Sequence, residues 1–431
     1  MIEYIKKIAS SPFIRSYFKI FSVDVMVKSA GIILLPIYLR LMTQEEFGLY
    51  GYFVAIIGIF SLVFNLGIYV AQSKLYHDYT EEKRGEVLFT LNLMLLVFII
   101  SFLALIFIFN LDYPVVNFLF KNPIDYDKYR VSVLLGVVVA VYSVMLTNFF
   151  LTSEDIRKVQ LFNISRILLI NCGVIGILHS TADVDHAFVR LQYSNFIEAL
   201  IIVFFSFFYI RKMKSHFNRG VAVKAIKISL PILASATIGV FINLSDRYFI
   251  EKYGTLKDLS IYNVALTFSG ILPFVFASFQ NVWLPQFLKE KDFQSNRSRS
   301  KKMILRLSVV FILLSLAILL ILKLMLLFDF IDSKYEAIMP LLPIVLVTGI
   351  ISSLTPMFSN HLIYLDKLYL IIVIGIPIAI IGVTLNIKLV PLFNIYGAAV
   401  STLITSACYL ISYLVLVNFF YREKMKTISQ K

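Results

Sequence analysis

Apolar stretches of about twenty residues alternate with short polar connections along the whole chain. A helix rising about 1.5 Å per residue needs about this length to cross a hydrocarbon layer of about 30 Å. Lipid admits only helices and closed barrels as spanning elements, and continuous apolar stretches lack the alternation of barrel strands. The pattern therefore predicts an all-α integral membrane protein with about twelve transmembrane helices.

The apolar stretches fall into two equal sets, separated by a basic connection at residues 211–227. This organisation predicts an N-terminal six-helix lobe at 1–210 and a C-terminal lobe at 228–431. The predicted spans of the first lobe are 20–40, 47–70, 87–109, 131–152, 161–180 and 188–210. The predicted spans of the second lobe are 228–250, 260–288, 303–328, 338–360, 368–390 and 397–420.

The basic residues predict the orientation of these spans. With both termini in the cytoplasm, the cytoplasmic segments hold 26 of the 40 Lys and Arg residues, and the opposite side holds eight. Loops rich in Lys and Arg stay in the cytoplasm, so this orientation is favoured. The cell inner membrane of a bacterium is the expected location.

Composition supports the same class of protein. Hydrophobic residues make up 59% of the chain and charged residues only 15%, whereas about a quarter of a soluble domain is charged. The net charge of +14 could indicate nucleic-acid binding, but its residues are spread over short loops. We interpret the charge as a topology signal that also favours contact with anionic membrane lipids, and we expect no nucleic-acid partner.

A weak internal repeat relates the two lobes. The shift that brings Thr43 onto Thr255 also aligns Tyr50 with Tyr262 and places the acidic Glu46 on Asp258. Because each lobe has an even number of spans, both lobes would enter the membrane from the same side. The repeat is therefore predicted to be parallel, giving two pseudo-symmetric six-helix lobes.

Three motifs resemble those of a known family. They are the segment from Arg40 to Tyr50 (RLMTQEEFGLY) with Asn65-Leu-Gly-Ile68, the segment Asp246-Arg-Tyr-Phe-Ile with Leu259-Ser-Ile-Tyr262, and Pro391 followed by Tyr396-Gly-Ala-Ala-Val-Ser-Thr402. Together they resemble the polysaccharide repeat-unit flippases, the Wzx-like O-antigen transporters of the multidrug/oligosaccharidyl-lipid/polysaccharide superfamily.

The resemblance implies two six-helix lobes around a central cavity that opens alternately to each side. The expected substrate is a polyprenyl-diphosphate-linked oligosaccharide of O-antigen and lipopolysaccharide synthesis, moved from the cytoplasmic to the periplasmic leaflet. A polymerase and a chain-length regulator of the same pathway would then be partners. The resemblance does not identify the sugar.

Ionisable residues inside spans are the candidate site residues, because such groups are costly in lipid and usually face a cavity or a partner. Lys28 and Asp24 share one face of the first helix, where Lys28 could meet a diphosphate or simply neutralise Asp24. Arg166 lies in the fifth span, with no partner evident in the sequence, and its guanidinium can bind phosphate bidentately. Arg247, near the outer end of the seventh span, is the third candidate cation.

Three acids are candidates for ion coupling: Glu198, Asp24 and Asp246. Glu198 lies about 15 Å into the sixth span, close to the membrane midplane. It could take a proton from the outer side and release it inward, or it could be a neutral structural residue. Asp246 and Arg247 could equally serve at the membrane interface or pair between the lobes.

Three other functions remain open, one of which is the export of another polysaccharide by a member of the same superfamily. A drug or cation exporter of the same superfamily should have a carboxylate-rich cavity, and the bases within these spans outnumber the acids. A membrane O-antigen polymerase should carry a long outer loop with catalytic groups, which this chain lacks, so we expect no enzyme. The five histidines show no metal-binding spacing, and no Gly-rich phosphate loop is present, so we expect no metal and no cofactor.

Overall fold

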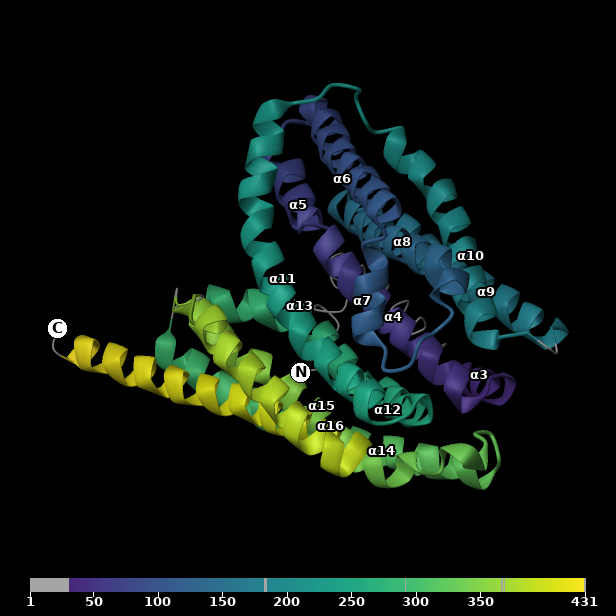
Figure 1. Cartoon of the computed structure of the whole chain (residues 1–431). Helices are drawn as coiled ribbons and strands as arrows, with labels where there is room; N and C mark the ends of the chain where they lie inside the picture. The colour runs from purple at the N-terminus through teal and green to yellow at the C-terminus, as the bar shows by residue number, and fades with distance from the viewer. Residues whose placement is uncertain (1–30, 182–183, 291, 366, 368, 430–431) are drawn as a thin grey trace, which may run out of the picture. The chain divides into compact units, whose positions relative to one another are not determined.

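The computed structural model describes residues 31–181, 184–290, 292–365, 367 and 369–429. Throughout these residues the secondary structure is helical, and nine helices are long and apolar enough to cross a membrane. The prediction of an all-α, multi-pass membrane protein is therefore confirmed. The chain divides into two compact units, unit 1 (Met1–Val240) and unit 2 (Phe241–Lys431), whose helices are labelled in Figure 1.

Unit 1 is built around one central helix, α8 (Tyr126–Thr152), which packs against α4, α5, α9 and α10. The helices before it are α3 (Leu35–Leu41), α4 (Gln44–Phe64), α5 (Ile68–Asp78), α6 (Glu81–Phe109) and α7 (Asp112–Leu119). The helices after it are α9 (Ile156–Ser180), α10 (His186–Ile210) and α11 (Arg219–Tyr253), and α11 continues into unit 2.

Unit 2 is centred on α15 (Ile338–Tyr364), which contacts each of the other long helices that follow α11. These are α12 (Leu256–Ser269), α13 (Ile271–Lys289), α14 (Phe293–Leu327) and α16 (Tyr369–Ser429), with the short 3₁₀ helix η1 (Ser333–Tyr335) before α15. Asn394 interrupts α16 with a φ of 49°, so α16 holds both predicted spans 368–390 and 397–420.

Local sequence explains where the helices begin. In α4 the Thr43 hydroxyl accepts from the Glu46 amide while the Glu46 carboxylate accepts from the Thr43 amide, and α12 begins with the same arrangement at Thr255 and Asp258. Such a capping box satisfies backbone donors at a helix start. The residues aligned by the sequence repeat thus occupy equivalent structural positions.

The helices differ from the predicted spans in several places, one of which is the span 260–288, divided at Gly270 between α12 and α13. The span 47–70 is broken at Leu66 and Gly67, whose positive φ angles of 53° and 69° end α4 and start α5. The predicted outer loop near 110–130 contains α7, because Asp112 is held by the Arg130 guanidinium through distances of 2.7 and 3.1 Å. The first predicted span, 20–40, lies mostly outside the described residues.

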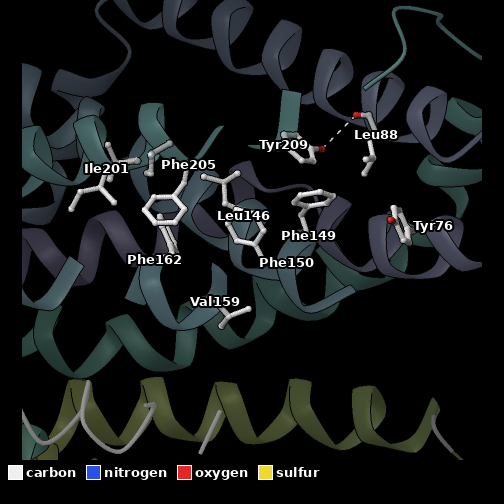
Figure 2. Packing of buried hydrophobic residues seen from close by; sticks show 12 residues of the cluster. Tyr76, Leu88, Leu146, Phe149, Phe150, Val159, Phe162, Ile201, Phe205 and Tyr209 are labelled. Atoms are coloured by element: carbon white, nitrogen blue, oxygen red, sulfur yellow. Dashed lines mark hydrogen bonds between the residues drawn. The ribbon is translucent and has the colours of Figure 1, made fainter. Parts of the chain in front are cut away.

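An aromatic core fixes one end of unit 1. Phe149 and Phe150 of α8 meet Phe162 of α9 and Phe205 and Tyr209 of α10 (Figure 2). The rings pack largely edge to face, with centroids 4.7 Å apart for Phe149 and Tyr209 and 5.1 Å apart for Phe162 and Phe205. This packing holds α9 and α10 firmly against α8, which sets the geometry of the adjoining cavity.

Candidate functional site

A cavity of about 600 Å³ lies within unit 1, which we call the unit 1 cavity. Residues of α4, α5, α8, α9 and α10 line it. Its polar lining comprises Tyr50, Ser61, Tyr69, Ser143, Thr147, Asn148, Arg166, Ser194, Asn195 and Glu198. A cavity of this size with a few polar groups on apolar walls is typical of a ligand site.

Two of the predicted site residues form an ion pair in this cavity. Arg166 Nη2 of α9 lies 2.5 Å from Glu198 Oε1 of α10. The exposed fractions of their side chains are 34% and 14%, so the pair is reached from the cavity without being fully hydrated. The Arg166 guanidinium also lies 5.5 Å from the centre of the Phe162 ring. The sequence-based view of Arg166 as a cation without a partner is therefore corrected.

The helix hairpin explains the pairing. α9 and α10 pack along each other and are joined by the short connection after Ser180. Arg166 lies about 21 Å from the end of α9, and Glu198 lies about 18 Å into α10, so both reach a similar depth. The sequence contains part of this signal, because residues equally far from a hairpin turn lie at a similar depth, but it does not show that both side chains lie between the two helices.

The sequence reasoning missed the polar side chains that complete the cavity wall. Asn148 Nδ2 donates to Gln72 Oε1 at 2.7 Å and to the Tyr69 carbonyl at 2.7 Å. Asn195 Nδ2 donates to the Ser132 carbonyl at 2.8 Å. These amides tie α8 to α5 and to α10, and α10 is the helix that carries Glu198 of the ion pair. Nothing in their local sequence distinguishes them from other polar residues of a span.

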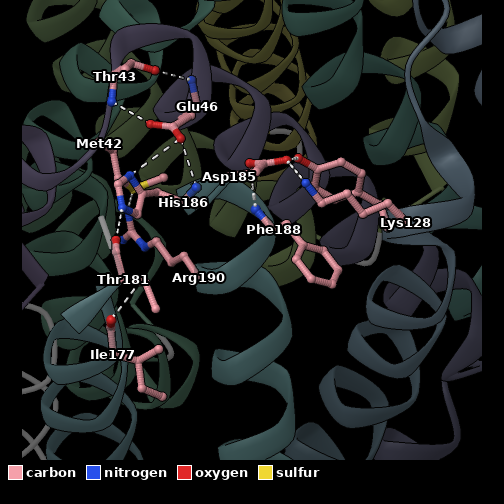
Figure 3. A network of polar contacts seen from close by, with 11 residues as sticks. Met42, Thr43, Glu46, Lys128, Ile177, Thr181, Asp185, His186, Phe188 and Arg190 are labelled. Atoms are coloured by element: carbon pink, nitrogen blue, oxygen red, sulfur yellow. Dashed lines mark hydrogen bonds and ion pairs between the residues drawn. The ribbon is translucent and has the colours of Figure 1, made fainter. Parts of the chain in front are cut away.

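A polar network joins the helix ends at one end of unit 1 (Figure 3). Glu46 Oε1 accepts from the His186 amide at 2.8 Å, which links the start of α4 to the start of α10. Asp185, the N-cap of α10, binds the Lys128 ammonium and the Tyr129 hydroxyl of α8. All of these groups lie at helix ends that the sequence assigns to the periplasmic side.

The hydrogen bonds of this network act on the pKa of Asp185. Burial by itself raises the pKa of a carboxyl group, but hydrogen bonds from Lys128, Tyr129 and the Phe188 amide favour the charged form. The net result lowers the pKa of Asp185 from its usual value. Asp185 therefore stays ionised and fixes the start of α10 against α8.

Arg190 lies next to this network, near the predicted outer end of the span 188–210. Its guanidinium carbon lies 3.6 Å from the ring centre of Tyr38 and 4.0 Å from that of Tyr50. Stacking on two tyrosines places the cation at the end of the unit 1 cavity that Tyr50 lines.

At the opposite end of unit 1, polar contacts join α6 to the connection between α10 and α11. The Lys214 amide donates to the Gly85 carbonyl at 3.0 Å, and the Asn218 amide donates to Thr90 Oγ1 at 3.0 Å. A Cβ atom at Gly85 would lie 2.9 Å from the Lys212 carbonyl oxygen, so only glycine allows this approach. These segments are the ones that the sequence assigns to the cytoplasm.

Asp246 and Arg247 of unit 2 each form hydrogen bonds with neutral side chains. Asp246 accepts hydrogen bonds from Tyr262 at 2.9 Å, Asn386 at 2.9 Å and Thr402 at 2.7 Å. Arg247 Nε donates to Asn263 Oδ1 at 2.9 Å. Asp246 also borders a small cavity of about 60 Å³. Three neutral donors thus hold this carboxylate in place.

Two of the predicted site residues belong to the first predicted span. Asp24 and Lys28 lie outside the described residues. Within the described residues, no group of three or more His, Cys, Asp or Glu side chains is arranged to hold a metal ion. The described parts of the predicted site are therefore the Arg166–Glu198 pair in unit 1 and the Asp246–Arg247 region in unit 2.

Comparison with known proteins identifies the family. A family model described as polysaccharide biosynthesis protein matches residues 13–291, and the chain belongs to this family. No curated protein sequence matches the chain significantly. The fold is shared with solved transporters of the superfamily that the sequence motifs indicated.

Three solved structures illustrate the shared fold. The lipid II flippase MurJ in an inward closed conformation has a TM-score of 0.72 at 15% identity, covering 92% of this chain and 87% of that chain. An inward-facing multidrug resistance MATE transporter of the MOP superfamily has a TM-score of 0.67 at 12% identity, covering 94% and 99%. A MOP superfamily transporter from Pyrococcus furiosus has a TM-score of 0.56 at 12% identity, covering 94% of each chain.

Proposed function

We propose that this protein moves a polyprenyl-diphosphate-linked oligosaccharide from the cytoplasmic to the periplasmic leaflet of a bacterial inner membrane. Both termini would lie in the cytoplasm, and the two lobes would open alternately to each side. The observation that carries the proposal is a guanidinium, Arg166, facing a cavity of about 600 Å³ among apolar helices. A guanidinium in such a place can bind a diphosphate that would otherwise be costly to bring into lipid.

The family and the fold support the same proposal. Membership of a polysaccharide biosynthesis family is consistent with a glycan as the cargo. The similarity to MurJ suggests a lipid-linked substrate, because that protein is a lipid II flippase. A polymerase and a chain-length regulator of O-antigen synthesis would then act on the product, and O-antigen is our proposal for the glycan.

Removal of the Arg166 charge tests the function. In proteoliposomes loaded with a fluorescent polyprenyl-diphosphate disaccharide, Arg166→Gln should lower the flipping rate at least about tenfold, since a charged hydrogen bond contributes about 1.5–3 kcal/mol. Arg166→Lys should restore it only in part, because an ammonium lacks the planar fork. The matched control is Lys323→Gln, which removes an exposed lysine of α14 and should flip at the wild-type rate.

Export of a cationic drug is the rival function, favoured by the Glu198 carboxyl in the same cavity and by the fold shared with MATE transporters. The same proteoliposomes distinguish the two when loaded with an organic cation such as ethidium. Transport of ethidium together with normal flipping by Arg166→Gln would contradict the flippase proposal.

A further inference from the structure

The Arg166–Glu198 pair places an acid where the anionic cargo should bind. Among the described residues that line the unit 1 cavity, these two alone carry a formal charge. Arg166 Nη2 and Glu198 Oε1 form an ion pair that lacks the geometry of a hydrogen bond, and Arg166 Nε is buried without a hydrogen-bond partner. A guanidinium has five N–H donors and binds phosphate oxygens through a pair of them. The cation therefore has unused donors, but its charge is already neutralised.

We propose that Glu198 is a displaceable counterion: the anionic head group of the cargo replaces Glu198 on Arg166, and the released carboxylate takes up a proton. This inference rests on the proposed function, because it requires an anionic cargo. The inference gives Arg166 and Glu198 one shared role. The sequence alone suggests anion binding for Arg166 and proton transfer for Glu198 as separate roles.

The surroundings of Glu198 leave a released carboxylate without another cation. From α9 the cavity is lined by Arg166 and the apolar Ile170, and α8 contributes only neutral groups that do not titrate, such as Thr147 and Asn148. The titratable groups from α4 and α5 are the hydroxyls of Tyr50 and Tyr69.

The charged groups nearest along the same helices already have partners elsewhere. Toward one end, His186 contacts Glu46, and Arg190 stacks on tyrosines. Toward the other end, Lys158 is bound to Asp155. A Glu198 carboxylate beside a bound diphosphate would therefore face a like charge in a partly dry cavity, and protonation relieves this repulsion.

The proton balance of the cycle follows from this exchange. When the diphosphate binds Arg166, Glu198 accepts one proton from water on the side to which the cavity is open. When the diphosphate leaves, Glu198 gives that proton to water on the release side and binds Arg166 again. No covalent bond is made or broken.

Anion binding and proton binding thus favour each other, so the proton moves in the same direction as the cargo. This direction is opposite to the one expected from the sequence, in which Glu198 accepts a proton outside and releases it inward. The pair cannot drive export with an inward proton gradient. Its effect is to reduce by one the negative charge that crosses the membrane with each anion.

Calorimetry of the purified protein in detergent tests the exchange directly. The probe is a short-chain polyprenyl-diphosphate N-acetylglucosamine, a diester whose two acidic groups stay ionised near neutral pH. Titrations in two buffers with different enthalpies of ionisation count the protons taken up per bound probe. For the wild type we expect a count between zero and one, and an affinity that rises by up to about tenfold for each unit of falling pH.

Variants separate the counterion role from a structural one. Glu198→Gln cannot compete for Arg166 or take up a proton, so it should bind the probe more tightly than the wild type, with no proton count and no pH dependence. The double variant Arg166→Gln/Glu198→Gln should bind weakly at every pH. A wild-type proton count of zero overturns the inference, even if Glu198→Gln fails to fold.

The outcomes also distinguish this inference from the proposed function. Equal proton counts for the wild type and Glu198→Gln, with normal binding, overturn the counterion role alone. Absence of probe binding by both proteins at all pH values overturns the proposed function and the inference together.

Discussion

Gly136 is the position where an added methyl group should most directly disturb the unit 1 cavity. It lies in α8, where a Cβ atom would be 2.6 Å from Ile57 Cδ1 and 2.7 Å from Asn195 Nδ2. The Ile57 tip can rotate away, whereas Asn195 is buried and donates to the Ser132 carbonyl. Gly136→Ala should therefore break this hydrogen bond and leave the Asn195 amide unsatisfied, at a cost of about 1–3 kcal/mol.

Gly58→Ala is the matched control. Gly58 lines the same cavity, in α4, but an added Cβ atom would meet nothing within 4 Å. Both changes remove a glycine from a helix interior, which by itself stabilises the helix by about 1 kcal/mol. The difference between the two variants, about 1–3 kcal/mol, therefore isolates the steric effect at Gly136.

Thermal unfolding of the purified variants in detergent measures this difference. For a unit of this size, 1 kcal/mol corresponds to roughly 2–4 °C in Tm. Asn195→Ala should remove the same hydrogen bond, so adding Gly136→Ala to it should cost little more. Equal melting temperatures for Gly136→Ala and Gly58→Ala, or fully additive effects of Gly136→Ala and Asn195→Ala, would refute the reasoning.

Three further predictions follow from the helix ends and loops. Reporter fusions at residues 220 and 295 should report cytoplasm and those at 120 and 184 periplasm, and a periplasmic signal at 220 would contradict the orientation. Thr43→Ala and Thr255→Ala should each lower the free energy of unfolding by about 1 kcal/mol through loss of a capping box, with Ser replacements near wild type in thermal unfolding. Because the pKa of Asp185 is lowered in the fold, its stabilisation is present above the unfolded-state value of about 3.9 and is lost as pH falls through the folded-state value. Asp185→Asn should therefore melt with a weaker dependence on acid pH than the wild type, and an unchanged dependence would count against this role.

The sequence predicts the helical spans well because each span is a local property. Every predicted span from 47–70 onward coincides with one or two helices, since lipid requires about twenty apolar residues and a satisfied backbone. The alignment of Thr43 with Thr255 in the sequence also matches the structure, because a capping box depends only on residues within one helix turn. The break at Leu66 and Gly67 was missed, because an apolar stretch continues through it and hydropathy does not report backbone angles.

The chemistry of the cavity could be predicted only in part, because it depends on the register between helices. Arg166 and Glu198 were both selected as costly charges within spans, but their pairing depends on the hairpin of α9 and α10. Arg190 was assigned to the outer side by its position, and only the packing of α3 and α4 against α9 and α10 reveals its stacking on Tyr38 and Tyr50. Charge alone could not show which of these cations is already neutralised.

The two units begin helices α4 and α12 with the same capping box, but their acids Glu198 and Asp246 have different partners. In unit 1 the carboxylate of Glu198 relies on a single cation, so whatever competes for Arg166 changes the charge balance of the cavity. In unit 2 the carboxylate of Asp246 is held by Tyr262, Asn386 and Thr402, and neutral donors do not exchange with an anion. In the proposed mechanism the acid of unit 1 is therefore exchangeable, whereas the acid of unit 2 is held by neutral donors. Under the proposed exchange, the capacity to respond to an anionic cargo belongs to unit 1 among the described residues. The shared geometry of the helix starts does not require the two units to share this capacity.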